Sequence, residues 1–266
     1  MADESTLEAV KAVYNGPEGD LWELIMGQQI HVGGLRSSMD LAMRAAVEGK
    51  AHGVDLCCCN GAGMRFLARF QRVARLTGVD ATGTVIERGI ARCRQEGFGD
   101  RITFVKSDVC RTGLADGCAD FVWGEDAWCY VEDKAALIAE AVRLVAPGGT
   151  IAFTDWVAGE VACTDAERAR FLSFMKFPNV QSVAGYRELL ERNGCKVIEA
   201  VDTGRFPEYV ELYIAMVDRQ LTYDALRILN FDEGLLAAVA GEMSFMLQLA
   251  RDRKITQGLL VARKGA

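Results

Sequence analysis

The sequence predicts an α/β fold in which a doubly wound, mostly parallel sheet carries helical additions at the N-terminus and after the fifth strand. Three observations predict it. Between residues 53 and 157, short apolar runs alternate with amphipathic helical segments, four consecutive runs end in a carboxylate, and the first run leads into a glycine-containing turn. Strands that alternate with helices form parallel sheets covered on both faces, as in a Rossmann-like fold.

Residues 1–50 predict a helical N-terminal cap. Turn-forming residues in NGPEGD and HVGGL separate its helical stretches, and serine or threonine can cap two of them. We expect helices with the following bounds: Ser5 or Thr6 to about Tyr14, Leu21 toward Met26, and Ser37 or Ser38 to Val47.

The central part of the chain predicts five parallel strands and the helices between them. The cores of these strands are continuously apolar, which suits strands buried on both faces. Strands are expected within GVDLCCC, RLTGVDA, ITFVKSDV, ADFVWGED and GGTIAFTDWV, and helices within MRFLARFQRVA, TVIERGIARCRQEG and DKAALIAEAVRLVA.

Past Asp155 the alternation loosens, and residues 158–182 and 206–253 predict helical additions close to the functional site. An inserted helix is expected at 162–176. The stretch SVAGYRELLERNG predicts a helix with a glycine C-cap, and CKVIEAVD and GLLVARK predict two more strands. We interpret residues 1–266 as a single domain with helical additions.

Composition and charge narrow the class of protein. The net charge is −7 and the pI is about 5.1, so no basic excess exists to neutralise nucleic-acid phosphates or anionic lipids. Two histidines argue against a His-rich site, and no metal is expected. Nine scattered cysteines indicate reduced thiols. Without a signal peptide or an apolar run of about 18 residues, we expect a cytoplasmic protein with no nucleic-acid or membrane partner.

Carboxylates at four consecutive strand ends are the strongest functional signal. They are Asp55, Asp80, Asp108 and the pair Glu125–Asp126. Ligands of open α/β sheets bind outside the carboxyl ends of the strands, and an acid after the second strand can accept hydrogen bonds from ribose hydroxyls. An acid after the third strand can accept from an exocyclic amine. No P-loop motif is present, so the pattern favours a nucleoside over a triphosphate.

These motifs resemble the class I methyltransferases that use S-adenosylmethionine, over about Val54 to Val157. The acid after the first strand, the alternate positions that follow it, GVDAT, VKSDV and RLVAPGGTIAFTD carry the resemblance. It implies S-adenosylmethionine as the cofactor and the following cofactor-binding residues: Asp55, Cys57, Cys59, Gly61, Asp80, Ala81, Asp108, Val109 and Glu125.

The turn CCCNGAG departs from the family pattern. Cys57 and Cys59 stand where the family carries glycines, which let the backbone come close to a cofactor. Four interpretations remain open: a diverged cofactor turn, a metal site, a redox or nucleophilic cysteine, and plain packing of small apolar side chains. We favour the diverged cofactor turn.

A narrower resemblance points to small-molecule methyltransferases, among them sarcosine/dimethylglycine and phosphoethanolamine N-methyltransferases. The segments QQIHVGG and WGEDAWCYVEDK carry it. Tyr130 stands where that branch has a histidine, a departure that puts its acceptor chemistry in doubt. The resemblance implies methyl transfer to a small-molecule acceptor, with an amine as one such acceptor.

Side chains near the acceptor follow from these segments. His31 and Asp126 are candidate catalytic residues, although a loop histidine without a role and a helix-capping acid are the alternatives. Trp128, Tyr130 and Trp156 are candidate substrate-binding residues whose aromatic faces can hold a cation, with core packing as the alternative. Tyr14 and Trp22 are candidates for an N-terminal lid. In EMSFMLQLARDR, methionines at helical spacing predict either core or the face of a homodimer.

The altered turn also motivates two rival hypotheses. The first is an enzyme on this fold with altered cofactor use that catalyses a non-methylation reaction, such as hydrolysis or dehalogenation. The second is a binding protein that keeps the pocket without chemistry. Loss of S-adenosylmethionine binding with a retained pocket would favour either rival over methyl transfer.

Overall fold

A seven-stranded sheet forms the centre of the chain, whose computed structural model describes residues 8, 11–14 and 16–265. The strand order is β3-β2-β1-β4-β5-β7-β6, and β7 alone runs antiparallel to its neighbours. The strand bounds are β1 His52–Leu56, β2 Arg75–Asp80, β3 Ile102–Lys106, β4 Ala119–Glu125, β5 Val145–Ala158, β6 Cys195–Asp202 and β7 Ile255–Lys264. The predicted α/β sheet, doubly wound and mostly parallel, is confirmed.

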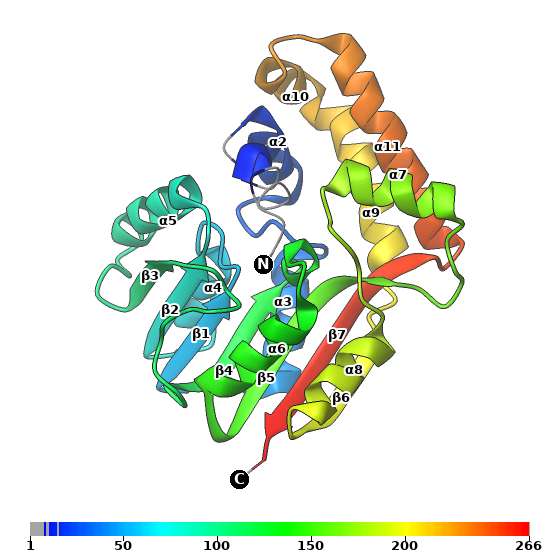
Figure 1. Cartoon of the computed structure of the whole chain (residues 1–266). Helices are drawn as coiled ribbons and strands as arrows, with labels where there is room; N and C mark the ends of the chain where they lie inside the picture. Colours follow the sequence, from blue (N-terminus) through cyan, green and yellow to red (C-terminus); the bar gives the residue numbers. More distant parts are fainter. Residues whose placement is uncertain (1–7, 9–10, 15, 266) are drawn as a thin grey trace.

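Helices cover both faces of this sheet (Figure 1). One buried cluster lies between the sheet and α3, α4 and α5, and a second lies between the sheet and α6 and α8. Burial of these apolar faces supplies the main driving force for the fold. The helix bounds are α3 Gly34–Ala45, α4 Ala62–Phe70, α5 Gly83–Gln95, α6 Lys134–Leu144 and α8 Val183–Arg192.

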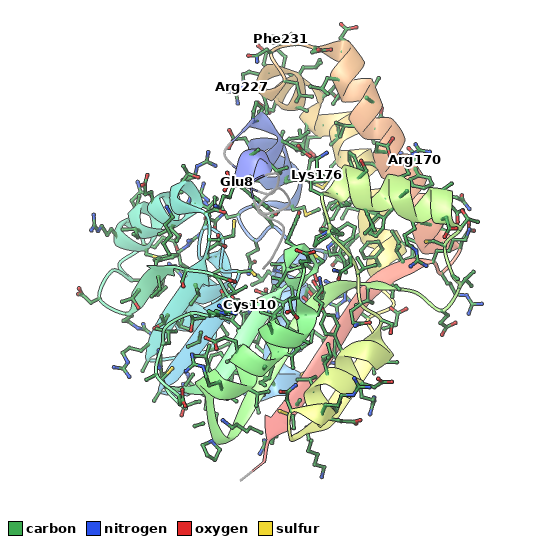
Figure 2. All side chains as sticks on the ribbon, in the orientation of Figure 1. Glu8, Cys110, Arg170, Lys176, Arg227 and Phe231 are labelled. Atoms are coloured by element: carbon green, nitrogen blue, oxygen red, sulfur yellow. The ribbon has the colours of Figure 1, made fainter. Side chains whose placement is uncertain are left out.

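Helical additions gather above one edge of the sheet and share a third buried cluster. Figure 1 shows them over the carboxyl ends of β4, β5 and the start of β7. Their bounds are α2 Pro17–Met26, α7 Asp165–Met175, α9 Phe206–Met216, a π-helical turn Val217–Leu221, α10 Thr222–Ile228 and α11 Glu233–Arg251. Arg227 and Phe231 lie at the tip of this group, far from the sheet (Figure 2). The interpretation of 1–266 as one domain stays a prediction.

Three predicted boundaries of the N-terminal cap need comment. The cap expected at Ser5 or Thr6 lies outside the described residues. Helix α2 begins at Pro17, inside the segment expected to interrupt a helix, because proline at the first helical position loses no hydrogen bond. Helix α3 begins at Gly34, so Ser37 and Ser38 lie within the helix and are fully buried; the prediction that they cap it was wrong.

The end of β1 also differs from the sequence prediction. The strand stops at Leu56, and the three cysteines form the turn that follows it. The paired strands β2 and β4 flank β1 on either side, which places this turn at the centre of the carboxyl edge. Among the described residues, no helix is both long and apolar enough to cross a bilayer.

Candidate functional site

The cysteine turn has the backbone of a glycine turn. The φ angles are +63° at Cys57, +47° at Cys59 and +73° at Gly61. Residues with a Cβ avoid this left-handed region at a cost of roughly 1–2 kcal/mol, whereas glycine enters it freely. Cysteines therefore occupy two positions whose conformation favours glycine, in the alternating pattern that the sequence resemblance implied.

Hydrogen bonds from the neighbouring strand hold this turn in place. The backbone N–H groups of Cys57 and Cys58 both donate to the carbonyl oxygen of Val79, at 2.9 and 3.1 Å. Asp80, at the end of β2, accepts from the N–H of Cys59 at 2.9 Å and from the N–H of Thr82 at 2.8 Å. The Asp80 carboxylate thus shapes the turn directly, and burial raises its pKa.

Two further carboxylates converge on Gly63, at the start of α4. A methyl group built on Gly63 would lie 2.8 Å from Oε2 of Glu125 and 3.4 Å from Oδ2 of Asp55. Burial, and secondarily the charges of Glu125 and Asp80, raises the pKa of Asp55 well above its ordinary value. No ion pair to lysine or arginine is formed by either carboxylate within the described part of the chain. The two acids therefore form a site that a cation would stabilise.

His31 is buried beside this acid pair, in the loop between α2 and α3. Its Nε2 lies 3.1 Å from Oγ of Ser38 and 3.4 Å from Oε1 of Glu125. Ser38 donates its hydroxyl proton to Glu125 at 2.6 Å, so its oxygen is available to accept from Nε2–H. Nδ1 of His31 is buried and has no hydrogen-bond partner. This arrangement leaves the lone pair of Nδ1 free.

Asp126 is fully engaged in structural hydrogen bonds. Its Oδ2 accepts from the N–H of Val32 at 2.8 Å, and the side-chain amide of Gln257 donates to both of its oxygens at 2.9 and 2.7 Å. Burial raises its pKa, and its φ is +50°. These contacts tie the loop of His31 to β7. Asp126 is therefore better placed to position that loop than to take a proton.

A small cavity joins these groups. Its volume is about 50 Å³, far below the roughly 300–1,000 Å³ of typical small-molecule sites, so the site is closed in this structure. The lining includes Tyr14, residues 28–31, residues 57–60, and the acids Asp55, Glu125 and Asp126. Tyr14 and the loop residues come from the N-terminal segment, and the lid interpretation of Tyr14 stays a prediction.

Tyr130 contacts Tyr14, which lines the cavity. Their hydroxyl oxygens are 3.2 Å apart, and their rings meet edge to face. Burial raises the pKa of both phenols well above the ordinary value, so both remain neutral near pH 7. Two neutral hydroxyl groups therefore lie at the boundary between the cavity and the helical additions.

Trp128, a predicted substrate-binding residue, lies in the core. Trp128 is fully buried below the site, stacks on Phe153 at 4.0 Å between ring centroids, and donates its indole N–H to the carbonyl oxygen of Leu56. Trp156 is also buried and packs against Phe171 and Phe206. Both tryptophans support the site from the core, whereas Tyr130 contacts Tyr14 of the cavity lining.

The remaining predicted cofactor residues lie toward the β3 edge. Asp108 follows β3, is exposed, and accepts from the N–H of Cys110 at 2.9 Å. Val109 is buried beneath it, and Ala81 follows Asp80 at the end of β2. They follow the paired strands β2 and β3, and none of the three lines the small cavity.

Sequence reasoning missed a buried network beneath the Trp128 segment. Asp155 accepts from the N–H of Cys129 at 2.9 Å and from the hydroxyl of Tyr186 at 2.6 Å. The Lys134 ammonium donates to the carbonyl oxygens of Cys129, Val131 and Asn179. Burial raises the pKa of Asp155 to about 6, and the positive charge of Lys134 opposes that rise. Asp155 lies inside β5, three residues before its end, so the strand-end pattern did not identify it.

The other interpretations of the cysteines find little support. Burial, followed by the charge of Asp80, raises the pKa of Cys59 to about 12, and burial raises the pKa of Cys57 and Cys58 well above the ordinary value. Buried thiols of this kind are poor nucleophiles because the thiolate is the reactive form. Within the described ranges, no three His, Cys, Asp or Glu side chains are grouped to hold a metal ion.

This chain resembles known proteins in both sequence and fold. Residues 54–153 match the model of a family described as a methyltransferase domain. The chain is 28% identical over 170 residues to a probable chloroplastic tocopherol O-methyltransferase of Oryza sativa, covering 56% of this chain and 46% of that protein. It is 30% identical over 149 residues to a dimethylglycine N-methyltransferase of Parasynechococcus marenigrum, covering 50% and 52%.

A solved structure extends the likeness to nearly the whole chain. The crystal structure of a putative sarcosine dimethylglycine methyltransferase from Galdieria sulphuraria matches with a TM-score of 0.80 at 22% identity, covering 94% of this chain and 98% of that one. At this identity, the match establishes a shared fold. The chain spans about half the length of the two sequence relatives it matches.

Proposed function

We propose that this chain, which belongs to the class I methyltransferases, transfers the methyl group of S-adenosylmethionine to a small-molecule acceptor. The observation that carries the proposal is the turn after β1, where two cysteines and a glycine keep the left-handed backbone beside Asp80 and the acid pair. This combination suits a nucleoside with a cationic amino-acid tail.

The residues of the site fit that cofactor. Asp80 is placed to accept from ribose hydroxyls, as acids after the second strand do, and Asp108 is proposed for the adenine amine. The buried carboxylates of Asp55 and Glu125 lack a cation in the described residues, and an ammonium group would supply one. A second polar group without a partner lies beside the two carboxylates. The buried indole Nε1 of Trp123 has no hydrogen-bond partner and lies near Gly63.

Entry of a cofactor requires the N-terminal cap to withdraw, because the closed cavity is too small. Polar contacts tie the cap to the helices of the sheet: Asp20 pairs with Arg88 and Glu23 with Arg92, both on α5, and Gln28 accepts from Arg65 on α4. Partly exposed ion pairs contribute little to stability. The cap is held mainly by the buried side chains of Leu21, Trp22 and Ile25, which belong to the third buried cluster.

The residues then have separable tasks in the reaction. S-adenosylmethionine, when bound, supplies an activated methyl group, so the protein mainly aligns the reactants and excludes water. Tyr14 and Tyr130 close the site and offer hydroxyl groups to an acceptor. His31 is oriented by Ser38 and Glu125 and takes a proton at Nδ1 when the acceptor must lose one. Asp126 positions the loop that carries His31.

Replacement of His31 by glutamine tests this division of tasks. We expect kcat to fall roughly 100-fold or more with a proton-bearing acceptor, as is typical for loss of a general base. Binding of S-adenosylhomocysteine should change only a few-fold. His52→Gln is the matched control, because His52 is the chain's other histidine and lies at the opposite end of β1. A fall in cofactor affinity as large as the fall in kcat would instead assign His31 to cofactor binding.

The cysteines of the turn give a second test. In Cys57→Gly/Cys59→Gly, the left-handed strain of roughly 1–2 kcal/mol per residue disappears, while the greater freedom of glycine in the unfolded chain offsets about half of it. We expect the free energy of unfolding to rise by about 1 kcal/mol and S-adenosylmethionine to bind several-fold more tightly. Urea unfolding and calorimetric titration measure the two effects. Cys58→Gly is the control, since Cys58 is buried and its φ is not positive; an equal gain there would contradict the strain argument.

The direct test of the function is turnover. The purified protein is incubated with S-adenosylmethionine and a panel of small amines, phenols and alcohols, and formation of S-adenosylhomocysteine is measured. Methyl transfer to at least one acceptor, together with micromolar binding of the cofactor, is expected. Absence of cofactor binding at millimolar concentration would exclude the proposal and leave the non-methylating enzyme or the binding protein.

A further inference from the structure

A patch of exposed apolar side chains lies on the outer face of α3. Leu35, Met39 and Met43 are 49%, 45% and 74% exposed, and their spacing of four residues places them on one side of the helix. Phe70, at the end of α4, is 52% exposed and borders the same surface. Exposed apolar side chains that gather in one patch mark an interaction surface, whereas scattered single ones need no explanation.

A broad hollow lies within this patch. Its volume is about 1060 Å³, above the roughly 300–1,000 Å³ of typical small-molecule sites. The lining comes from α3, from the end of α4, and from residues 203–205 and 208–209, which lead from β6 into α9. Met43 lines the hollow and is the most exposed large apolar side chain among the described residues. The surface therefore offers both a hollow and a protruding side chain.

The charges of this surface are complementary to one another. Arg36 and Glu208 line the hollow, are exposed, and have no ion-pair or hydrogen-bond partner among the described residues. The other charged lining residues form ion pairs: Asp40 with Arg44 and Arg205, and Glu48 with Arg72. One unpaired charge of each sign therefore remains on the patch.

We propose that two copies of this chain associate through this surface about a two-fold axis. Such an interface is isologous: when Arg36 of one copy contacts Glu208 of the second copy, the reciprocal contact forms as well. Both unpaired charges are then satisfied, and complementary charges fix the register of the interface. Met43 of each copy fills part of the hollow of the other, because the flexible methionine side chain adapts to irregular surfaces.

The C-terminal methionines do not provide this contact. The stretch EMSFMLQLARDR predicts either core or the face of a homodimer, and in the structure Met243 and Met246 are buried in the third cluster. They therefore belong to the core. The exposed methionines of α3 are better placed for a contact between copies, and this contact is independent of the proposed methyl transfer.

The hollow shares residues with the packing of the loop that carries His31. A methyl group built on Gly33 would lie 3.2 Å from Cδ of Arg205, which lines the hollow. The ring of Tyr209, also in the lining, contacts the ring of Tyr213 at 6.1 Å between centroids. The Tyr213 hydroxyl accepts from the N–H of Gly33 at 3.0 Å. A second copy seated on this surface would therefore restrain α9 and the loop of His31 together.

Sedimentation velocity of the purified chain over a range of concentrations tests the association. We expect a monomer–dimer equilibrium with a dissociation constant below about 100 µM, at the weak end of specific interfaces. Hydrogen exchange at low and high concentration locates the contact. Amides of residues 34–45 and 203–210 should exchange more slowly in the dimer, with those of α11 as the reference. A chain that stays monomeric at about 200 µM, or a dimer that protects neither segment, refutes the proposal.

Charge reversal tests the proposed pair. Arg36→Glu and Glu208→Arg each place like charges opposite each other in the dimer, so each should weaken association at least 10-fold. A mixture of the two single variants should associate as strongly as the natural chain, because both contacts of the mixed dimer are then complementary. Both positions are exposed, so the Tm of each dilute variant should not change. Weak association in the mixture would exclude the pair and overturn the proposal.

Met43→Asp tests the apolar part of the contact. We expect it to weaken association at least 10-fold, because a carboxylate would have to enter the hollow of the second copy. Leu235→Asp is the matched control, since Leu235 is 46% exposed in the first turn of α11 and the change in charge is the same. Equal weakening by the two substitutions would show that net charge rather than the α3 surface controls association, and would contradict the proposal.

Discussion

Asp80→Ala is expected to weaken binding of S-adenosylmethionine by about 100-fold or more. The carboxylate is proposed to accept hydrogen bonds from the ribose, and hydrogen bonds to charged groups contribute about 1.5–3 kcal/mol each. Loss of two, about 3–6 kcal/mol, exceeds the roughly 2.8 kcal/mol that a 100-fold change requires. Calorimetric titration with S-adenosylmethionine and S-adenosylhomocysteine measures the loss.

The same substitution also affects the turn in the protein without bound cofactor. Asp80 also accepts from the N–H groups of Cys59 and Thr82, so its removal frees the turn from β2. Asp80→Asn keeps one acceptor oxygen and should show an intermediate loss of affinity. Asp100→Ala is the control, because Asp100 is an exposed acid that precedes β3. Unchanged affinity in Asp80→Ala would remove the basis of the proposed nucleoside site.

The fold was predictable because its signal is repeated along the chain. Each apolar run followed by a helical stretch contributes the same pattern, and small errors at one element leave the others intact. The errors in the predicted helix boundaries occur where a residue type is compatible with two local structures. Pro17 lies in a segment that indicates a break but starts α2, and Ser38 resembles a helix cap but lies buried inside α3 and donates to Glu125.

Only the part of the candidate site that lies at strand ends could be predicted from the sequence. Strand ends bring Asp55, Asp80 and Glu125 to one edge of the sheet, because parallel strands share their carboxyl ends. That pattern does not predict the direction in which a side chain points. Trp128 points into the core rather than toward an acceptor, and the contact of Tyr14 with Tyr130 joins segments 116 residues apart. The roles assigned to these residues remain predictions.

Lys134→Met is expected to destabilise the protein by about 3 kcal/mol at pH 7.5, the magnitude typical of removing one partner from a buried charged network. Three carbonyl oxygens lose their donor, and Asp155 loses the positive charge that opposes the rise of its pKa. Urea unfolding at pH 7.5 and pH 5 measures the loss. Lys196→Met, at an exposed position of β6, is the control for removal of a lysine.

The pH dependence separates the two causes of this loss. Burial raises the pKa of Asp155 to about 6 in the folded protein, above the value near 4 of the unfolded chain. The folded state therefore binds this proton more tightly, and its stability falls as pH rises from about 4 to about 6. Without Lys134 the folded pKa rises further, so the penalty continues to grow above pH 6. At pH 5 Asp155 is mostly protonated in both folded proteins, and only the lost hydrogen bonds remain.

Asp155→Asn isolates the electrostatic part. Asparagine can still accept from the N–H of Cys129 and face Tyr186, but it cannot ionise. In this background we expect Lys134→Met to cost about 1–2 kcal/mol less at pH 7.5 than in the natural chain, a coupling typical of residues in one network, and to cost the same at pH 5. Identical costs at both pH values in both backgrounds would mean that Lys134 acts through its hydrogen bonds alone, with no contribution from the charge of Asp155.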